Sequence, residues 1–409
     1  VLSAPFLLVR RGRHYLQTFP GRMGLGRRPD CRGALWIHAV SVGEVGVAAT
    51  LARALPATIP LLITTVTPTG QARAREIFGD LDRQATVAYL PFDLGFTVGP
   101  FFRHFAPAGL ILVEGDYWPL LLHEALRREV PVAVVNGRVG ERAFGRMRRV
   151  PRLSGRLFFD GIRAFGVQTD EDRRRLIASG AAQERVYTTG NLKYDTPPPA
   201  PKPELEERVR RLAAGRPILI AGSTMAGEEV QVLAAHRRIG GGERALLVLA
   251  PRHPERWDAA ARLAADSGFA TARRSSFGDA SNGADVLLLD SLGELAALYE
   301  VADVAFIGGT LVPTGGHNPL EPAHFAIPTV VGPSMENFRE IAAEFERADA
   351  WQVVDGGREL ARAWDDWLRD PEKARLHGTR ARQLLTANRG AIDRTLELLA
   401  PILSGSSWS

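Results

Sequence analysis

A proline-rich break near the middle of the chain constrains its fold more than any other feature. The segment TPPPAPKP, residues 196–203, has five prolines in eight positions. Proline lacks a backbone N–H donor, so this segment can continue neither a sheet nor a helix interior. The chain has 409 residues, and single hydrophobic cores stop growing at roughly 250–300 residues. We therefore expect two domains, residues 1–195 and 204–409, joined by a semi-rigid linker at 196–203.

Short apolar runs alternate with longer segments of helical period on both sides of this break. Apolar runs that are buried on both faces and separated by helices are typical of a parallel, doubly wound α/β sheet. The expected fold is therefore two Rossmann-like domains facing across a central cleft. The helical C-terminal segment, residues 359–399, is assigned to the second domain, although its last helix could cross back to brace the first. The predicted strands are residues 34–40, 60–66, 86–92, 109–115, 130–136, 163–169 and 186–190, then 216–223, 245–251, 286–290, 304–309 and 328–333.

The composition excludes several classes of protein. With 45% hydrophobic and 24% charged residues, the chain is close to the average soluble globular protein. It is therefore not wholly disordered, fibrous or a multi-span membrane protein. Its single cysteine, Cys31, excludes an intramolecular disulfide, and no Cys/His cluster has the spacing of a zinc site.

The net charge of +5 is unevenly distributed. Residues 1–195 hold 27 Lys and Arg against 17 Asp and Glu, a net charge of +10. The remaining residues hold 24 against 29, a net charge of −5. A basic first half indicates an anionic partner. The charge alone does not distinguish between nucleic acid, acidic lipid and phosphorylated sugar as this partner.

The first nine residues form an apolar stretch followed by Arg10, Arg11 and Arg13. This stretch is far shorter than the ~20 residues needed to span a bilayer. Three interpretations stay open: part of a membrane anchor, a helix lying at the membrane interface with its arginines among phosphates, or an ordinary helix packed on the first domain.

Two carboxylates follow predicted strands of the first domain, where ligands bind in parallel sheets. Glu44 lies in WIHAVSVGEVG, in the first turn of the helix that follows the first strand. It is either a favourable acidic residue on the helix dipole or a general base. Glu114 follows a buried apolar run in LILVEGDYWP. It is either a structurally paired carboxylate or part of a site rimmed by Asp116, Tyr117 and Trp118.

A run of arginines begins beyond the fifth predicted strand, with Glu141 as its one acidic residue. Charge runs usually form a solvated face, but guanidinium groups also bind phosphate in a bidentate manner. Few aromatic residues interrupt the run, which argues against stacking on nucleic acid bases. An acidic headgroup or a phosphorylated glycolipid is the better-supported partner. The arginines are Arg138, Arg142, Arg146, Arg148, Arg149, Arg152 and Arg156.

The strand ends of the second domain indicate a nucleotide site. Ser223 and Thr224 open the helix in AGSTMAGEE, where free N–H groups attract anions. Arg252 follows the next strand, and glycine-rich loops precede Asn318 and Glu321. Each feature is weak alone, but their succession at consecutive strand ends favours nucleotide binding. Lys193, in GNLKYD just before the linker, could neutralise a phosphate or carboxylate.

These segments together resemble the Kdo (3-deoxy-D-manno-octulosonic acid) transferases, glycosyltransferases of lipopolysaccharide synthesis with the GT-B fold. The resemblance runs through WIHAVSVGE, VEGDYWP, NGRVGERAF, GNLKYD, GSTMAGEE, PRHPER, LGEL and GGTLVPTGGHNPLEPA. Small departures occur at Gly137, Ala143 and Thr310, where family members more often have Ala, Ser and Ser.

The resemblance implies transfer of Kdo from CMP-Kdo to a lipid A precursor (lipid IVA), with release of CMP, on the cytoplasmic face of the inner membrane. It implies that Glu44 is the general base and that Glu114 and Lys193 support the transition state. The donor carries its own leaving group, so we expect no cofactor and no metal requirement. The first domain would bind the acceptor, its phosphates meeting Arg138, Arg142, Arg146, Arg148 and Arg149 beside an anionic membrane surface. The second would bind CMP-Kdo through Ser223, Thr224, Pro251, Arg252, Leu292, Gly293, Glu294, Asn318, Pro319, Leu320 and Glu321.

Two rival functions share the expected architecture, because a fold does not fix a function. A sugar-nucleotide 2-epimerase would bind a UDP-sugar and gain nothing from an arginine-rich face. A non-catalytic lipid-binding relative would not need Glu44 or a complete nucleotide site.

Overall fold

The computed structural model describes residues 18–23, 31–276 and 283–404. The chain forms two compact units, one comprising residues 1–196 and 388–409 and the other residues 197–387. The expected domain limits, 1–195 and 204–409, differ from this division mainly at the C-terminus, because residues 388–409 belong to the first unit. The N-terminal apolar stretch with Arg10, Arg11 and Arg13 lies outside the described residues.

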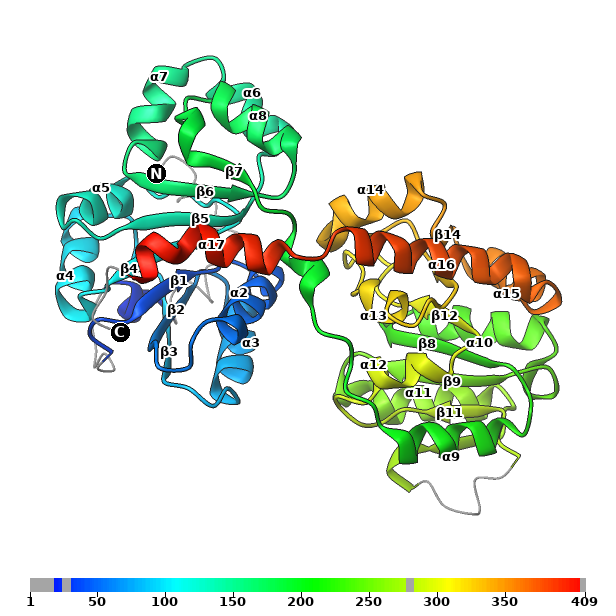
Figure 1. Cartoon of the computed structure of the whole chain (residues 1–409). Coiled ribbons are helices and arrows are strands. Elements are labelled where there is room, and N and C mark those ends of the chain that lie inside the picture. Colours follow the sequence, from blue (N-terminus) through cyan, green and yellow to red (C-terminus); the bar gives the residue numbers. More distant parts are fainter. Residues whose placement is uncertain (1–17, 24–30, 277–282, 405–409) are drawn as a thin grey trace. The chain divides into compact units, whose positions relative to one another are not determined.

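The first unit contains a seven-stranded parallel sheet in the order β3-β2-β1-β4-β5-β6-β7 (Figure 1). Its strands are β1 (Leu35–His38), β2 (Leu61–Thr65), β3 (Ala85–Tyr89), β4 (Gly109–Val113), β5 (Val132–Gly137), β6 (Ile162–Val167) and β7 (Val186–Thr188). The helices are α2 (Val42–Ala54), α3 (Pro68–Gly79), α4 (Gly95–Phe105), α5 (Pro119–Arg127), α6 (Glu141–Met147), α7 (Pro151–Ser154), α8 (Asp170–Ala178) and α17 (Ala391–Leu403). A π-helix, η1 (Gly155–Phe159), and two 3-10 helices, η2 (Gln183–Arg185) and η3 (Leu192–Asp195), complete the unit.

Alternate residues of the central strands β1, β2, β4 and β5 face two separate cores. Leu35 and Ile37 of β1 pack toward α2, α3 and α17, whereas Trp36 packs on Phe101 and Phe102 of α4. Burial on both faces explains why the strands are nearly continuous apolar runs. Because both of its faces are packed, the sheet holds the loops that follow the carboxyl ends of its strands in fixed positions.

The second unit contains another seven-stranded parallel sheet, in the order β10-β11-β9-β8-β12-β13-β14. Its strands are β8 (Ile218–Thr224), β9 (Leu246–Pro251), β10 (Thr271–Arg273), β11 (Val286–Leu288), β12 (Val304–Ile307), β13 (Thr329–Val331) and β14 (Gln352–Val353). The α-helices are α9 (Pro203–Ala213), α10 (Glu228–Arg238), α11 (Trp257–Asp266), α12 (Leu295–Leu298), α13 (Leu320–Ala323), α14 (Arg339–Arg347), α15 (Gly357–Arg369) and α16 (Pro371–Ala387). Short 3-10 turns are η4 (Gly241–Glu243), η5 (Pro254–Arg256), η6 (Arg274–Ser276), η8 (Tyr299–Val301) and η9 (Glu336–Phe338).

The predicted fold class is confirmed: both units are doubly wound parallel α/β sheets, and each of the twelve predicted segments overlaps a strand. Sequence reasoning missed β10 and β14. The first, Thr271–Arg273, is half-polar, and the second is a two-residue edge strand. Neither presents the apolar run by which the other strands were found.

Candidate active site

Each sheet has one point where the strand order reverses direction, and Glu44, Glu114 and Ser223 lie at or just beyond the ends of strands at these points. In the first unit this switch point falls between β1 and β4, so the loops carrying Glu44 and Glu114 are neighbours. In the second unit it falls between β8 and β12, next to the loops at Ser223 and Gly308. Ligands of open α/β sheets bind in the crevice that this reversal creates.

Glu44 closes a capping box at the start of α2. Its carboxylate accepts hydrogen bonds from the backbone N–H of Val40 at 2.7 Å and from the hydroxyl of Ser41 at 2.9 Å. Ser41 is the N-cap residue and accepts the Glu44 N–H in return. The arrangement fixes the carboxylate at the carboxyl edge of β1, and it leaves the side chain partly exposed.

The pKa of Glu44 is raised to about 7, chiefly by burial and also by the charges of Glu114 and Asp116, against the lowering effect of the Val40 and Ser41 hydrogen bonds. A carboxylate with a pKa near neutrality is well matched to proton transfer at physiological pH. The helix-dipole and general-base interpretations of Glu44 are therefore compatible. The capping hydrogen bonds fix the position of the carboxylate, and burial beside other acidic side chains raises its pKa.

Glu114 occupies a left-handed backbone conformation (φ 62°) directly after β4. Its carboxylate lies 3.5 Å from the ammonium of Lys193 and 3.4 Å from the guanidinium of Arg138. The structure therefore brings together three residues predicted separately from distant segments. Glu114 and Lys193 are 15% and 17% exposed, which limits the screening of this ion pair by solvent.

One residue of this cluster, Asn136, was not predicted, whereas Asp116 was expected at the rim of the site. Asp116 follows Glu114 in the same loop, and burial together with the charge of Glu114 raises its pKa. Asn136 is the penultimate residue of β5, lies beside Glu114 and is fully buried. The sequence signal for Asn136 was a polar residue at the end of an apolar strand. This signal does not reveal its hydrogen-bond partners, which lie 22 and 56 residues away.

In the second unit a buried carboxylate organises the loop after β12. Glu228 accepts hydrogen bonds from the backbone N–H groups of Gly309, Thr310 and Leu311 at 2.7–2.9 Å. A Cβ atom on Gly308 would overlap the carbonyl oxygen of Ser223, so only glycine allows β8 and β12 to approach this closely. Sequence reasoning missed Glu228, which holds the glycine-rich loop at the switch point.

Ser223 and Thr224 were expected at the start of the following helix, but both belong to the end of β8, and α10 begins at Glu228 with Gly227 as its N-cap residue. Ser223 has a left-handed backbone (φ 56°) and is partly exposed. Thr224 is fully buried, donates to Glu229 at 3.4 Å through its hydroxyl, and accepts the Arg252 N–H through its carbonyl. Thr224 therefore ties β8 to the loop after β9, and Ser223 is the more accessible of the two.

Arg252, Asn318 and Glu321 form an electrostatic cluster with His317. The Arg252 charge and burial lower the pKa of His317 to about 4, burial being the larger cause, so its imidazole is neutral at pH 7. Burial raises the pKa of Glu321, whereas a hydrogen bond from Asn318 at 3.3 Å and the Arg252 charge oppose this. The Asn318 carbonyl oxygen also accepts the Leu320 N–H at the start of α13, beside Pro319. The charge of Arg252 thus acts on both His317 and Glu321.

The remaining predicted nucleotide residues differ in accessibility. Pro251 is the last residue of β9, and Leu292 is 69% exposed beside Gly293, whose φ is 73°. Glu294 is held by both nitrogens of Arg274 at 2.9 Å. Because its carboxylate is occupied by this bidentate ion pair, Glu294 stabilises its own loop. The accessible groups of the loop belong to Leu292 and Gly293.

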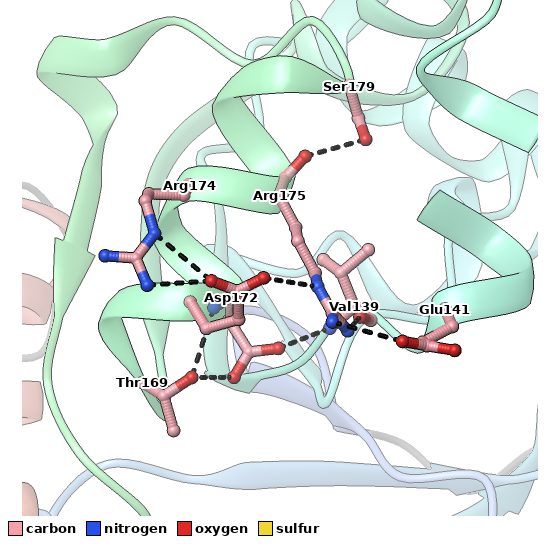
Figure 2. A network of polar contacts seen from close by, with 8 residues as sticks. Val139, Glu141, Thr169, Asp172, Arg174, Arg175 and Ser179 are labelled. Carbon is pink, nitrogen blue, oxygen red and sulfur yellow. Dashed lines mark hydrogen bonds and ion pairs between the residues drawn. The ribbon is translucent and has the colours of Figure 1, made fainter. Parts of the chain in front are cut away.

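The arginine run separates into two parts. Arg138 contacts Glu114, whereas Arg142, Arg146, Arg148 and Arg149 are exposed on or just beyond α6. Figure 2 shows that the acidic residue of the run, Glu141, instead meets Arg175 of α8, at 3.6 Å. Across residues 18–23, 31–276 and 283–404, no ion pair joins Arg142, Arg146 or Arg149 to an acidic side chain.

A polar network fixes the orientation of α6 relative to α8 (Figure 2). Asp172 accepts the Val139 N–H at 2.8 Å and the hydroxyl of Thr169 at 2.6 Å. Arg175 donates to the Val139 carbonyl at 3.1 Å and pairs with Glu171 at 2.9 Å. The network holds the loop between β5 and α6, and so presents the exposed arginines on a fixed support.

The part of the chain that the structure describes has no group of three His, Cys, Asp or Glu side chains able to hold a metal ion. Nor does any described helix combine the length and hydropathy that crossing a membrane requires.

Comparisons with solved structures define the class of fold. A UDP-GlcNAc 2-epimerase from Neisseria meningitidis superposes with a TM-score of 0.54, covering 90% of this chain and 99% of that one, at 11% identity. A glycosyltransferase from Rickettsia africae superposes with a TM-score of 0.55, covering 91% and 99%, at 12% identity. At these identities the similarity shows the fold alone, which is that of the two-domain GT-B proteins.

Sequence comparisons then identify the family within that class. A family model described as 3-deoxy-D-manno-octulosonic-acid transferase (kdotransferase) matches residues 17–196. A 3-deoxy-D-manno-octulosonic acid transferase from Haemophilus influenzae is 35% identical over 97% of this chain and 94% of its own length. One from Bordetella pertussis is 35% identical over 93% and 90%. The chain belongs to the Kdo transferase family and is a glycosyltransferase, which confirms the family expected from the sequence motifs.

Proposed function

We propose that this protein is an inverting Kdo transferase that moves Kdo from CMP-Kdo to the lipid A precursor and releases CMP. The observation that carries the proposal is Glu44, a rigidly capped carboxylate at a switch point whose pKa is about 7. Family membership favours this function over that of a 2-epimerase, although both share the fold.

In the proposed reaction Glu44 removes the proton from an acceptor hydroxyl group. The hydroxyl oxygen then forms a bond to the anomeric carbon of Kdo while the bond from that carbon to the CMP phosphate oxygen breaks. Attack from the face opposite CMP inverts the anomeric centre. Because the phosphate leaves with its electron pair, the transition state has oxocarbenium character, and nearby cations and N–H groups lower its energy.

Each cluster has a role in this scheme. Lys193, held 3.5 Å from Glu114, supplies positive charge near the reacting centre. Arg252 binds the CMP phosphate, and Glu321 accepts hydrogen bonds from the ribose hydroxyls. Ser223 and the backbone around Gly293 and Asn318 complete the nucleotide site. CMP is a good leaving group, so the transfer is proposed to proceed without a metal or cofactor.

The acceptor is proposed to reach the first unit from an anionic membrane surface. The exposed arginines beyond β5 are followed by Val150, Leu153 and Leu157, which are 49%, 54% and 46% exposed. Their i, i+3 and i+7 spacing through α7 and η1 places apolar side chains next to Arg152 and Arg156. A face with apolar residues beside arginines suits a bilayer interface, where acyl chains and phosphates are layered. This supports a peripheral position on the cytoplasmic face of the inner membrane.

The direct test incubates the protein with CMP-Kdo, with and without a lipid A precursor, and measures CMP release and the mass of the product lipid. We expect release that depends on the acceptor and a lipid heavier by whole Kdo units. A 2-epimerase would instead interconvert UDP-sugars without lipid, and a non-catalytic relative would bind lipid without releasing CMP. Either pattern would refute the proposal.

A further inference from the structure

Asn136 lies at the carboxyl end of β5, directly beside the end of β4, where Glu114 begins the next loop. Its side chain is fully buried, and its backbone is left-handed with φ 54°. Glu114 beside it has φ 62°. Left-handed conformations are costly for residues other than glycine and asparagine, and persist where the surroundings determine them. Asparagine tolerates this conformation, so it is the left-handed backbone of Glu114, beside Asn136, that indicates a locally constrained site.

The side-chain amide of Asn136 makes contacts in two directions. Its nitrogen is 3.5 Å from Oε1 of Glu114, the same oxygen that lies 3.5 Å from Nζ of Lys193. Its Oδ1 accepts the backbone N–H of Leu192 at 2.9 Å, in the turn η3 that carries Lys193. One buried side chain therefore connects the carboxylate of Glu114 to the backbone that sets the position of Lys193.

The amide suits both contacts because it carries a hydrogen-bond donor at one end and an acceptor at the other. Its NH2 group donates to a carboxylate, and its oxygen accepts from an N–H, so no donor faces a donor and no acceptor faces an acceptor. Glu114 also raises the pKa of Glu44 through its charge, after the larger effect of burial. A change in the negative charge around Glu114 is therefore expected to alter the pKa of Glu44, whereas a change in how its carboxylate is held is expected to alter the position of Lys193.

We infer that Asn136 is a positioning residue for the transfer reaction, acting through Glu114 and Lys193 without contacting the substrates. This inference rests on the proposed function, because it assumes that these two side chains support the transition state. It goes beyond that function by assigning the geometry of the pair to one buried amide that bridges β5 and η3.

Two substitutions separate the two contacts. Asn136→Asp keeps the oxygen that accepts the Leu192 N–H and keeps a residue that tolerates positive φ, but places a second carboxylate against Glu114. Asn136→Gly also tolerates the backbone but removes both contacts. The measurements are the pH dependence of kcat/KM, the KM for CMP-Kdo, the melting temperature, and hydrogen–deuterium exchange of the peptide at residues 191–196.

We expect a different pattern from each variant. Asn136→Gly lowers kcat about 10-fold and speeds exchange at 191–196, while the acidic limb of the pH profile stays in place. Asn136→Asp keeps exchange slow but moves the acidic limb upward by about one pH unit, because added negative charge makes Glu44 harder to ionise. The KM for CMP-Kdo should change less than about twofold in both, since the nucleotide site is in the other unit.

A purely structural role would lower the melting temperature in both variants and leave kcat per folded molecule, the pH limb and exchange at 191–196 unchanged. That result would overturn the inference. If the wild-type protein released no CMP, the proposed function would fail instead. The exchange measurement would then still decide whether Asn136 positions η3, so the two failures are distinguishable.

Discussion

The carboxylate of Asp195 accepts a hydrogen bond from the backbone N–H of Gly390 at 2.8 Å, although 195 positions separate the two residues. It accepts a second bond from Ile392 at 2.5 Å, so it satisfies free N–H groups at the start of α17. Arg394 of the same helix donates to the carbonyl of Thr189 at 2.8 Å. The C-terminal helix therefore packs on the first unit and braces the turn that carries Lys193.

We expect Asp195→Ala to lower the free energy of unfolding of the first unit by about 1–2 kcal/mol, as loss of a helix cap does. Asp195→Asn keeps one acceptor oxygen and should therefore lose less unfolding free energy than Asp195→Ala. Urea unfolding of both variants measures the difference. Equal stability of Asp195→Ala and wild type would show that α17 is held by its apolar face alone.

The raised pKa of Glu44 predicts a pH-dependent cost in stability. A carboxyl group whose pKa is about 7 in the folded protein and near 4.5 when unfolded binds its proton more tightly in the folded state. Its contribution to stability is thus complete below about pH 4.5 and declines as the pH rises through 7. Glu44→Gln, which cannot ionise, should be more stable than wild type at pH 8 by about 1–3 kcal/mol and equal at pH 4. Thermal unfolding at both pH values tests this, and an equal difference at both would contradict it.

The nucleotide site is tested by two substitutions in the second unit. Arg252→Ala should weaken CMP binding by ~1.5–3 kcal/mol if the guanidinium makes a charge-assisted hydrogen bond to the phosphate. Glu321→Ala should also weaken CMP binding, through lost ribose contacts, with little effect on lipid binding. Calorimetric titration with CMP measures both. Unchanged affinity in both variants would mean that the nucleotide binds elsewhere.

The exposed arginines are tested by changing Arg146, Arg148 and Arg149 together to glutamine. Each basic residue near an anionic surface contributes ~1 kcal/mol, and salt screens this attraction over about 8–10 Å. Binding to anionic vesicles should fall steeply at low salt and less at high salt, with CMP binding unchanged. A matched control changes three exposed arginines of the second unit, Arg358, Arg362 and Arg375, and should retain vesicle binding. Unchanged vesicle binding with a lowered melting temperature in the first variant would show that its arginines serve the fold.

The fold could be predicted from the sequence because its signals are local. Most of the long strands are buried apolar runs, and the proline-rich segment lies where one unit ends. The edge strands β10 and β14 were missed because few of their residues are apolar. The placement of α17 was left open because its packing depends on contacts such as Asp195–Gly390, which no local pattern encodes.

The candidate site could be predicted only where a residue follows a strand in a recognisable motif. Glu44 and Glu114 met that condition, and whether they act in transfer stays a prediction. Asn136 and Glu228 escaped because their partners lie far along the chain and their importance comes from the hydrogen bonds themselves. Glu294 matched a motif, but only the structure shows that Arg274 already occupies its carboxylate.

The measurement that tests the account most directly compares wild type with Glu44→Gln for acceptor-dependent CMP release across pH 5 to 9. The amide preserves the shape of the side chain but cannot accept a proton. For wild type we predict kcat/KM to rise with pH through about 7, as Glu44 loses its proton. For Glu44→Gln we predict loss of transfer at every pH, with the CMP affinity measured by calorimetry unchanged. Near-normal turnover in Glu44→Gln would remove Glu44 from the mechanism and contradict the account.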